Sequence, residues 1–276
     1  MSSADASLPP PSAWRAQLAL AREPVPGDWL RWCLGGIELG WLAPARVAPL
    51  LAVLEGSRVE GRRLVWAGQD LAPAERSRRM QGAALRLRDL GLIPGWRGEA
   101  YACEQPVEAP ERQRGASLFE MERAAFRFFG LQSRAAHVNG FCAGRLWCGR
   151  RAPDKATDPG LLDNLAAGGL PAGEALADCA RRELFEEAGV PAALTAGLRE
   201  QGAVQVRRPV AEGLHDEVLQ VFRLDLPEDF RPRNQDGEVS EFLCLSPDQA
   251  LARCQAGEFT RDAAVVMACG LLADAV

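Results

Sequence analysis

Three glutamates that fall within five residues are the strongest chemical signal in this chain. Glu183, Glu186 and Glu187 stand at positions i, i+3 and i+4, so on an α-helix their side chains project from one face. Like charges at this spacing repel each other, and the neighbouring Arg182, which can pair with Glu186, cannot neutralise three acids. Ligand sets made only of oxygen favour Mg²⁺, with Mn²⁺ as the alternative. The cluster therefore predicts a divalent metal site.

The residues around these glutamates predict the helix and a flexible loop that leads into it. Strong helix formers fill 175–188, Gly189 stands where a C′ glycine ends a helix, and Pro191 prevents its continuation. The glycine-rich stretch from Gly168 to Glu174 lets the backbone approach a metal or a phosphate closely. Carboxylate-bound metal beside such a loop suits hydrolysis of a phosphate anhydride. The competing interpretation of the three glutamates alone is a solvated acidic helix face.

The full spacing decides between these interpretations. The pattern G-x5-E-x7-R-E-L-x-E-E-x-G-V runs from Gly168 to Val190, and it resembles the Nudix box at each of its nine defining positions. The resemblance implies that Glu183, Glu186 and Glu187 bind divalent cations and that the carbonyl of Gly168 adds a ligand. It also implies that Arg182 and Glu174 orient the site through ion pairing.

A further acid from a later loop commonly acts as ligand or general base in the Nudix superfamily, and the box does not fix its position. Glu238 in the stretch DGEVSEF is the first candidate, with Glu241 as the second. Asp236 and Glu217 stand behind them. Each of these acids has the alternative interpretation of an ordinary surface residue.

A narrower resemblance covers most of the chain. The stretches HVNGF (137–141), KATDPGLLDN (155–164), LIPGWRGEAY (92–101) and FEMERAAFRFFG (119–130) are similar to the Nudix branch found at the N-terminus of certain fungal thiamine pyrophosphokinases and in free-standing relatives. The resemblance implies hydrolysis of thiamine diphosphate, or of its oxy or oxo damage forms, to the monophosphate and phosphate.

Several polar residues in these stretches are candidates for binding such a substrate. Lys155, the only lysine of the chain, offers a point charge for a phosphate. His137 and Asn139 alternate along an expected strand, so both face one side and offer hydrogen bonds to a polar ring. Asp163 and Asn164 act similarly or end a strand. The aromatic residues Phe141 and Trp147 either stack on the ring or belong to the core.

The elements expected from the sequence form two domains that meet near residue 130. The first, 1–130, is a small α+β domain, and the second, 131–276, is an α/β/α Nudix sandwich. A capping-box pattern at Ser117 and Glu120 predicts a helix that ends at Phe129 and Gly130. The other expected elements are strands at 29–34, 37–42, 62–66, 98–103, 137–142, 145–150, 202–209, 217–226 and 239–245, and helices at 44–54, 73–90 and 262–273, with a capping box at Ser246 that opens one more.

Composition excludes several classes of function. A net charge of −5 argues against electrostatic binding of nucleic acid or anionic lipid. The N-terminus lacks a signal-peptide pattern and no apolar run reaches the length of a membrane span, so we expect a cytoplasmic protein with reduced cysteines. The expected partner is a small-molecule diphosphate, and a homodimer is compatible with the sequence.

Three other functions remain as alternatives on the same fold. One is a hydrolase of a nucleoside diphosphate derivative such as ADP-ribose, and another is a regulator that binds ligand without catalysis. The third is an isomerase, which needs a protonating cysteine, and Cys142 is the nearest candidate for it. None of the eight cysteines forms a C-x-x-C pair, so a zinc-ribbon member that cleaves NADH is disfavoured.

Overall fold

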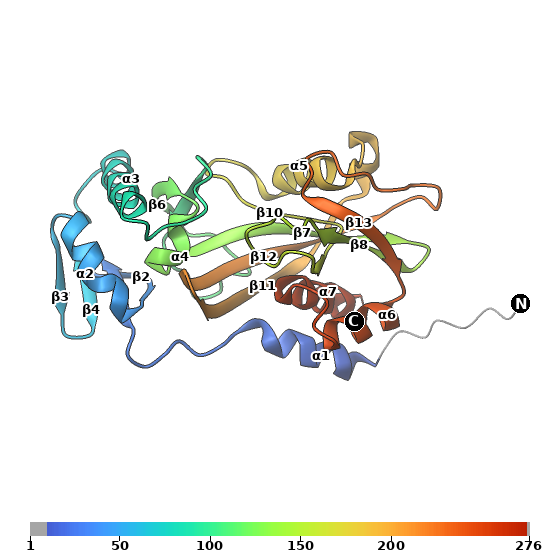
Figure 1. Ribbon diagram of the computed structural model, residues 1–276, viewed down its shortest axis with the longest axis horizontal. Coiled ribbons are helices and arrows are strands. Elements are labelled where there is room, and N and C mark those ends of the chain that lie inside the picture. Colours follow the sequence, from blue (N-terminus) through green and yellow to red (C-terminus); the bar gives the residue numbers. More distant parts are fainter. Residues whose placement is uncertain (1–9, 275–276) are drawn as a thin grey trace, which may run out of the picture.

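The computed structural model describes residues 10–274, which build a layered body with a smaller module at one end (Figure 1). The helices are α1 (Pro11–Leu18), α2 (Pro44–Val53), α3 (Pro73–Asp89), α4 (Ala125–Phe129), α5 (Leu176–Ala188), α6 (Pro247–Gln255) and α7 (Arg261–Ala273), with 3-10 helices η1 (Ala19–Ala21) and η2 (Ala192–Gly197). The strands are β1 (Leu30–Leu34), β2 (Ile37–Leu42), β3 (Ser57–Glu60), β4 (Arg63–Trp66), β5 (Ala100–Glu104), β6 (Ser117–Glu122), β7 (Gln132–Cys142), β8 (Arg145–Arg151), β9 (Leu162–Asp163), β10 (Ala166–Gly169), β11 (Arg199–Val210), β12 (Gly213–Asp225) and β13 (Val239–Leu245). Within the described range, no helix combines the length and the apolar character needed to cross a membrane.

A mixed sheet with the strand order β11-β12-β7-β8-β13 forms the middle layer. β7 runs parallel to β12 and antiparallel to β8, and the short β10 pairs with β7. Alternate residues of β7 face opposite layers: Ala136 packs in a cluster with Leu184 of α5, whereas Ala135 packs with Val265 of α7. The predicted α/β/α sandwich is therefore confirmed.

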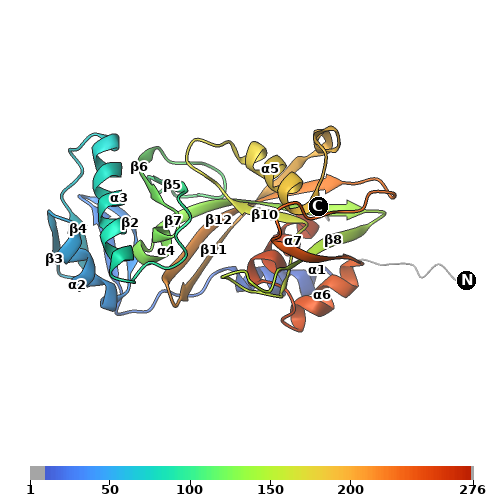
Figure 2. The same ribbon diagram turned by 45° about the horizontal axis from the view of Figure 1, so that its top comes forward.

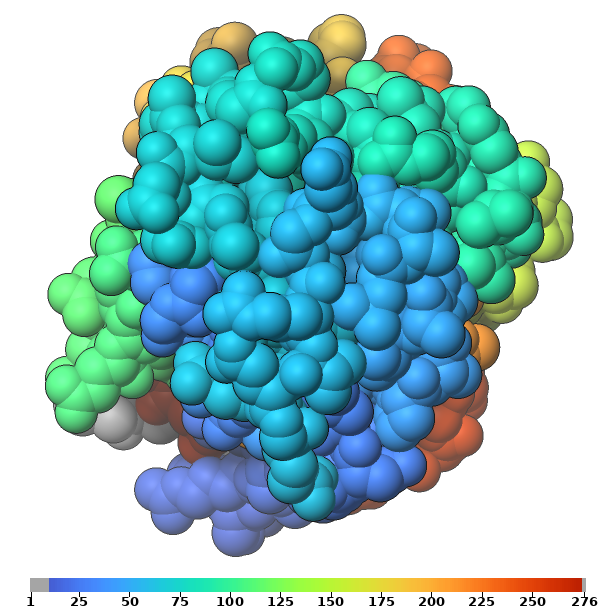
Figure 3. Space-filling model, turned by 90° about the vertical axis from the view of Figure 1, so that its left-hand side faces the viewer, coloured from blue at the N-terminus to red at the C-terminus, as the bar shows by residue number. Residues whose placement is uncertain are grey.

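The N-terminal module, which we define as residues 30–129, covers one end of the sandwich (Figure 3). It contains the four-stranded sheet β2-β1-β4-β3, the hairpin β5-β6 and the helices α2, α3 and α4. Trp32, Trp66, Phe119 and Phe129 are buried in its own hydrophobic core. In contrast, Trp14 of α1 packs in a cluster with residues of α6 and α7, so the first described helix lies on the sandwich. The domain boundary near residue 130 stays a prediction.

The predicted helix that starts at Ser117 is wrong, because this segment is strand β6. It pairs antiparallel with β5, and Phe119 and Met121 are buried in the core of the N-terminal module. A strand places alternate side chains on one face, so burial of these two residues favours β structure over the local capping pattern. Only α4 at Ala125–Phe129 is helical, and it ends at Gly130, whose φ is 59°. The strand β3 was not predicted.

Candidate functional site

Helix α5 carries the three glutamates on a rigid element. It begins after Ala175 and ends at Gly189, which adopts a left-handed conformation with φ 64°. Its apolar side, which includes Cys179, Ala180 and Leu184, packs against the sheet together with Ala136 and Val138 of β7. The helix therefore holds its polar side toward β10, the strand that contains Gly168.

Gly168 is where the backbone and the carboxylates meet. A Cβ atom built on Gly168 would lie 1.9 Å from Oε1 of Glu183, so only glycine leaves room for this carboxylate. The backbone N–H of the preceding Ala167 donates to Oε2 of Glu187 at 2.9 Å. Two of the three predicted ligands thus lie against the edge of β10, beside the peptide that contains the Gly168 carbonyl.

Arg182 binds three carboxylates of the motif. Its guanidinium makes two parallel bonds to Glu174, each 3.0 Å long, and Nη1 donates to Glu183 at 2.6 Å and to Glu186 at 3.1 Å. The hydrogen bonds to Glu174, together with Glu183, raise the pKa of Arg182 despite its partial burial. This geometry can fix the orientation of the carboxylates, and it is the ion pairing that the sequence predicted. The catalytic and ligand roles of these residues stay predictions.

The surroundings of Glu183 and Glu187 disfavour the ionised forms of these two carboxylates. Burial and the negative charge of Glu183 raise the pKa of Glu187 well above its usual range, although the Ala167 N–H acts in the opposite direction. Burial also raises the pKa of Glu183, against the effect of Arg182. Glu186 is more open, since 42% of its side chain is exposed. A bound divalent cation would relieve this repulsion, so the donor set fits Mg²⁺ or Mn²⁺.

The loop acid Glu238 lies within electrostatic reach of Glu183, and its predicted role as ligand or general base stays a prediction. It accepts a bond from Nζ of Lys155, and its charge acts on Glu183. Burial acts to raise the pKa of Glu238, but Lys155, Arg97 and Arg151 outweigh it, so its pKa is lowered. Lys155 therefore binds a carboxylate at the site, and its predicted role toward phosphate stays a prediction.

The other predicted acids lie in different surroundings. Glu241 is half exposed and pairs with Arg150, and Asp236 binds within its own turn, where it accepts from the N–H of Glu238. Glu217 accepts a bond from Ser133 at 2.7 Å and lies close to His215 and Asp262. Because Asp262 already binds both Arg208 and His215, this second group is an ion-pair network in the described structure.

The predicted substrate residues of β7 bind Asn164, which directly follows β9. Nδ1 of His137 lies 2.9 Å from Oδ1 of Asn164, and Nδ2 of Asn164 donates to Oδ1 of Asn139 at 2.9 Å. All three side chains are buried. Asp163 binds Arg151 at 2.9 Å, and its charge contributes to the raised pKa of Glu187. The structure thus brings Asp163 toward the carboxylates and joins the other three in a separate network.

Phe141 and Cys142 are buried in the sandwich, and Trp147 is partly buried. Phe141 packs in the cluster that includes α6 and α7, and Trp147 packs against the cluster below α5. Cys142 is buried at the far end of β7, six residues beyond Ala136, which pairs with Gly168, and this spacing corresponds to about 20 Å along a strand. Cys142 is therefore not placed to transfer a proton at the carboxylate cluster.

A cavity of about 340 Å³ lies beside Gly169, where the N-terminal module meets the sandwich. Gly169, next to Gly168, and Ala156, next to Lys155, line it from the sandwich. The module contributes Arg97, Tyr101 and Arg123. The sequence did not single out these three residues, although all of them stand in the stretches 92–101 and 119–130 that carry the narrower resemblance. Figure 2 shows the hairpin β5-β6 beside β7, which explains how the module reaches the site.

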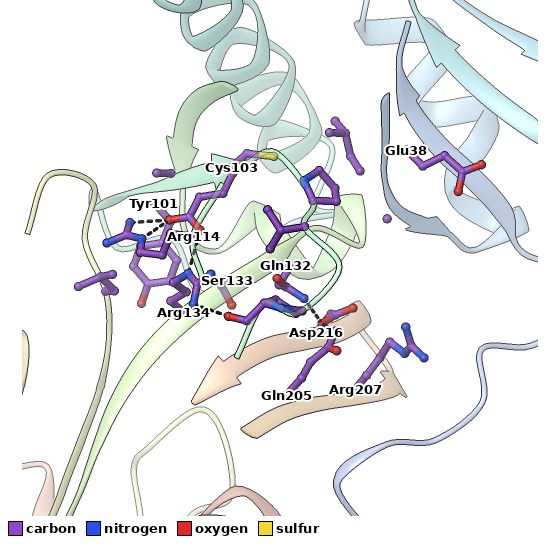
Figure 4. A pocket seen from close by; sticks show the side chains of 18 of the residues that line it. Glu38, Tyr101, Cys103, Arg114, Gln132, Ser133, Arg134, Gln205, Arg207 and Asp216 are labelled. Atoms are coloured by element: carbon purple, nitrogen blue, oxygen red, sulfur yellow. Dashed lines mark hydrogen bonds and ion pairs between the residues drawn. The ribbon is translucent and has the colours of Figure 1, made fainter. Parts of the chain in front are cut away.

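A second cavity, of about 320 Å³, lies between the module and the sheet (Figure 4). Its polar groups largely bind one another: Gln132 and Gln205 both donate to Asp216, at 3.1 and 2.7 Å. Arg134 donates to Glu104 at 2.8 Å. The box glutamates line neither cavity. The polar groups of the second cavity largely bind one another, whereas the guanidinium of Arg97 in the first has no partner among residues 10–274, so the first cavity is the better candidate for the substrate.

Two family models match adjacent parts of the chain. Residues 133–266 match the NUDIX domain, and residues 24–133 match a domain of unknown function, DUF4743. A crystal structure from Deinococcus radiodurans aligns with a TM-score of 0.48 and 25% identity, over 62% of this chain and 99% of that one.

Curated relatives agree with the family models. Nudix hydrolases 20 and 24 of Arabidopsis thaliana, both described as chloroplastic, are 38% and 37% identical over 63% and 69% of this chain. The matches span about half the length of these relatives, 46% and 52%. A Nudix hydrolase of Pseudomonas aeruginosa is 34% identical over 52% of this chain and 81% of its own length. With its complete box, its sandwich fold and these relatives, the chain belongs to the Nudix hydrolase family.

Proposed function

We propose that this chain is a divalent-metal-dependent pyrophosphohydrolase that cleaves a diphosphate by attack of water on phosphorus. The observation that carries the proposal is the convergence of Glu183 and Glu187 on the edge of β10 at Gly168. Glu183, Glu186, Glu187 and the Gly168 carbonyl would hold the cation. When bound, Mg²⁺ supplies neutralisation of phosphate charge and a lower pKa for a coordinated water.

The remaining residues have roles that follow from their contacts. Glu238 is our candidate for the general base, since its charge acts on Glu183 and 40% of its side chain is open to solvent, where it can accept a proton from water. Lys155 orients this carboxylate through their direct bond. Arg182 keeps Glu183 and Glu186 in place, anchored in turn by its two bonds to Glu174.

We further propose thiamine diphosphate, or its oxy or oxo forms, as the substrate, with the monophosphate and phosphate as products. The cavity beside Gly169 supports this choice because its walls carry opposite charges. Arg97 and Arg123 line it from the N-terminal module, and Glu212 and Glu217 line it from the sandwich. Such a cavity suits a molecule with an anionic diphosphate and a cationic ring, as thiamine diphosphate has.

The test is a comparison of kcat/KM for thiamine diphosphate, its oxo form, ADP-ribose and a nucleoside triphosphate, each with Mg²⁺. We expect a thiamine compound to give the highest value. Glu187→Gln should reduce kcat by about 10²–10⁴, the range typical of groups that act in catalysis. Glu60→Gln is the control, because Glu60 lies on β3 of the N-terminal module, is half exposed and pairs with Arg58.

The possible outcomes separate the two levels of the proposal. If ADP-ribose or a triphosphate exceeds every thiamine compound, the substrate assignment is wrong and the hydrolase assignment stands. If Glu187→Gln retains the activity of the wild type, the assignment of the metal site is wrong.

A further inference from the structure

Two arginines of the N-terminal module line the cavity beside Gly169, and neither belongs to the Nudix box. Arg123 follows β6, and Arg97 lies in the loop that precedes β5. Both act electrostatically on the carboxylates of the sandwich: Arg123 interacts with Glu183, and Arg97 with Glu238. The module therefore directs positive charge toward the place where a diphosphate would meet the metal.

Most of the hydrogen-bonding capacity of these two guanidinium groups remains free for a ligand. Arg123 donates from Nη1 to Glu99 at 2.5 Å, and no other side-chain bond of Arg123 occurs among residues 10–274. Arg97 is exposed, and in the same part of the chain its guanidinium makes no hydrogen bond or ion pair. Arginine presents five N–H donors in a planar fork that matches phosphate oxygens.

A single buried carboxylate holds both arginine-bearing segments in place. Glu122 is 2% exposed, and its oxygens accept the backbone N–H of Arg97 at 3.0 Å and of Gly98 at 2.9 Å. The same carboxylate accepts the N–H of Ala124 at 3.3 Å, directly after Arg123. A buried carboxylate is stable only when such donors satisfy it, so it couples the loop at 97–98 to the end of β6.

Tyr101 completes the wall between the two arginines and the sandwich. A Cβ on Gly169 would lie 1.5 Å from the Tyr101 hydroxyl, so this side chain rests directly on the glycine beside Gly168. The guanidinium of Arg123 lies 5.6 Å from the centre of the Tyr101 ring, on its face. The module is thereby fixed to the edge of the metal site through a close backbone contact.

We propose that Arg97 and Arg123 form an anion site in the N-terminal module that holds a phosphate of the substrate, and that Glu122 positions both. The inference rests on the proposed function for its ligand class, a diphosphate. It gives the module a direct role in substrate binding, in which the sandwich supplies the metal ligands and the module supplies the cationic clamp.

The experiment uses methylenediphosphonate, which cannot be hydrolysed, as the probe in calorimetric titrations of the full chain with Mg²⁺. The variants are Arg97→Ala, Arg123→Ala, Arg123→Lys and Glu122→Gln. Arg78→Ala is the matched control, because Arg78 lies in the same module and 76% of its side chain is exposed. Binding of Mn²⁺ alone, followed by electron paramagnetic resonance, reports whether the carboxylate cluster is intact.

We expect about tenfold weaker binding of the probe for Arg123→Ala, the lower end for a hydrogen bond to a charged group, and a smaller loss for the exposed Arg97→Ala. Arg123→Lys should restore part of the affinity, and Glu122→Gln should weaken binding although it removes no cation. Affinity for Mn²⁺ should stay at the wild-type value in all variants. In hydrolysis assays the arginine variants should raise KM more than they lower kcat.

Unchanged probe affinity in both alanine variants, or no binding of the probe by the wild type, would overturn the inference. The proposed function fails separately. If the wild type binds the probe through the arginines but hydrolyses no diphosphate, the anion site stands and the catalytic proposal is wrong. If hydrolysis is normal and both variants match the wild type, the catalytic proposal stands and the anion site is wrong.

Discussion

Replacing Gly168 with alanine tests whether the edge of β10 and Glu183 act as one unit. The new Cβ would lie 1.9 Å from Oε1 and 2.0 Å from Cδ of Glu183, whereas ordinary contact begins at 3.4 Å. The carboxylate must therefore withdraw by about 1.5 Å, the difference between these values for Oε1. A displacement of about 1 Å at a reacting centre can cost about 10²-fold in rate. We expect Gly168→Ala to lower kcat/KM by at least this factor and to weaken Mn²⁺ binding.

The same substitution should leave the fold largely intact. The atoms that must move belong to the far end of a flexible side chain, and a strained rotamer costs about 1 kcal/mol. The assay pairs diphosphate hydrolysis with Mn²⁺ titration, and a thermal melt verifies folding. Gly197→Ala is the matched control, because the nearest atom to its Cβ would lie at 3.9 Å and its φ is not positive. Wild-type turnover and wild-type Mn²⁺ affinity in Gly168→Ala would refute the reasoning.

Three further predictions concern the charged groups. Arg182→Ala should lower kcat by about 10–10²-fold, because Glu183 and Glu186 lose their shared partner. Arg182→Lys should not restore the rate, since lysine cannot reproduce the two parallel bonds to Glu174. Steady-state kinetics on both variants would check this. The raised pKa values of Glu183 and Glu187 mean that the folded chain without metal binds protons more readily than the unfolded chain. The melting temperature of the metal-free chain should therefore rise as the pH falls from 8 toward these pKa values, while Mn²⁺ affinity falls over the same range. Thermal melts at fixed salt and Mn²⁺ titrations at each pH measure the two quantities. Profiles that do not change with pH would contradict the assignment. Asp262→Asn should lower the free energy of unfolding by about 3 kcal/mol, because Arg208 and His215 lose their common carboxylate, as urea denaturation would show. His215 and Arg208 hold the pKa of Asp262 below its usual range against the effect of burial, so its contribution is present above about pH 4 and is lost as the pH falls further; a difference between the two proteins that stays constant down to pH 2 would contradict this.

The sequence was most informative where local chemistry and tertiary packing require the same structure. Helix α5 is an example, since its composition and its terminal glycine favour a helix, and its apolar side at Leu184 packs on the sheet. At Ser117 the two conflict. The capping pattern favours a helix, but Phe119 and Met121 occupy the core of the module only when the chain is extended. Tertiary burial outweighed the local preference, which a single sequence does not reveal.

In the candidate site, too, residues whose positions follow from spacing along the chain were predictable, whereas residues placed by tertiary packing were not. The box glutamates could be placed on one helix because their spacing along the chain sets their relative positions. The box sets no position for the loop acid, so Glu238 was one of four candidates. Arg97 and Arg123 could not be placed, because their approach to the site depends on how β5 and β6 dock against β7. His137 and Asn139 were correctly placed on one face of a strand, but periodicity does not show what covers that face. In the structure, Asn164 joins them in a buried network.

Because Lys155 binds Glu238, chemical labelling of this lysine would report on the candidate active site. Because every other basic side chain except the two histidines is an arginine, a reagent that acylates amines has one internal target among the side chains. That target is 16% exposed and is tied to the loop acid whose charge acts on Glu183. The extent of labelling at Lys155, measured as a mass shift on one peptide, would thus follow the opening and occupation of the site without any engineered probe.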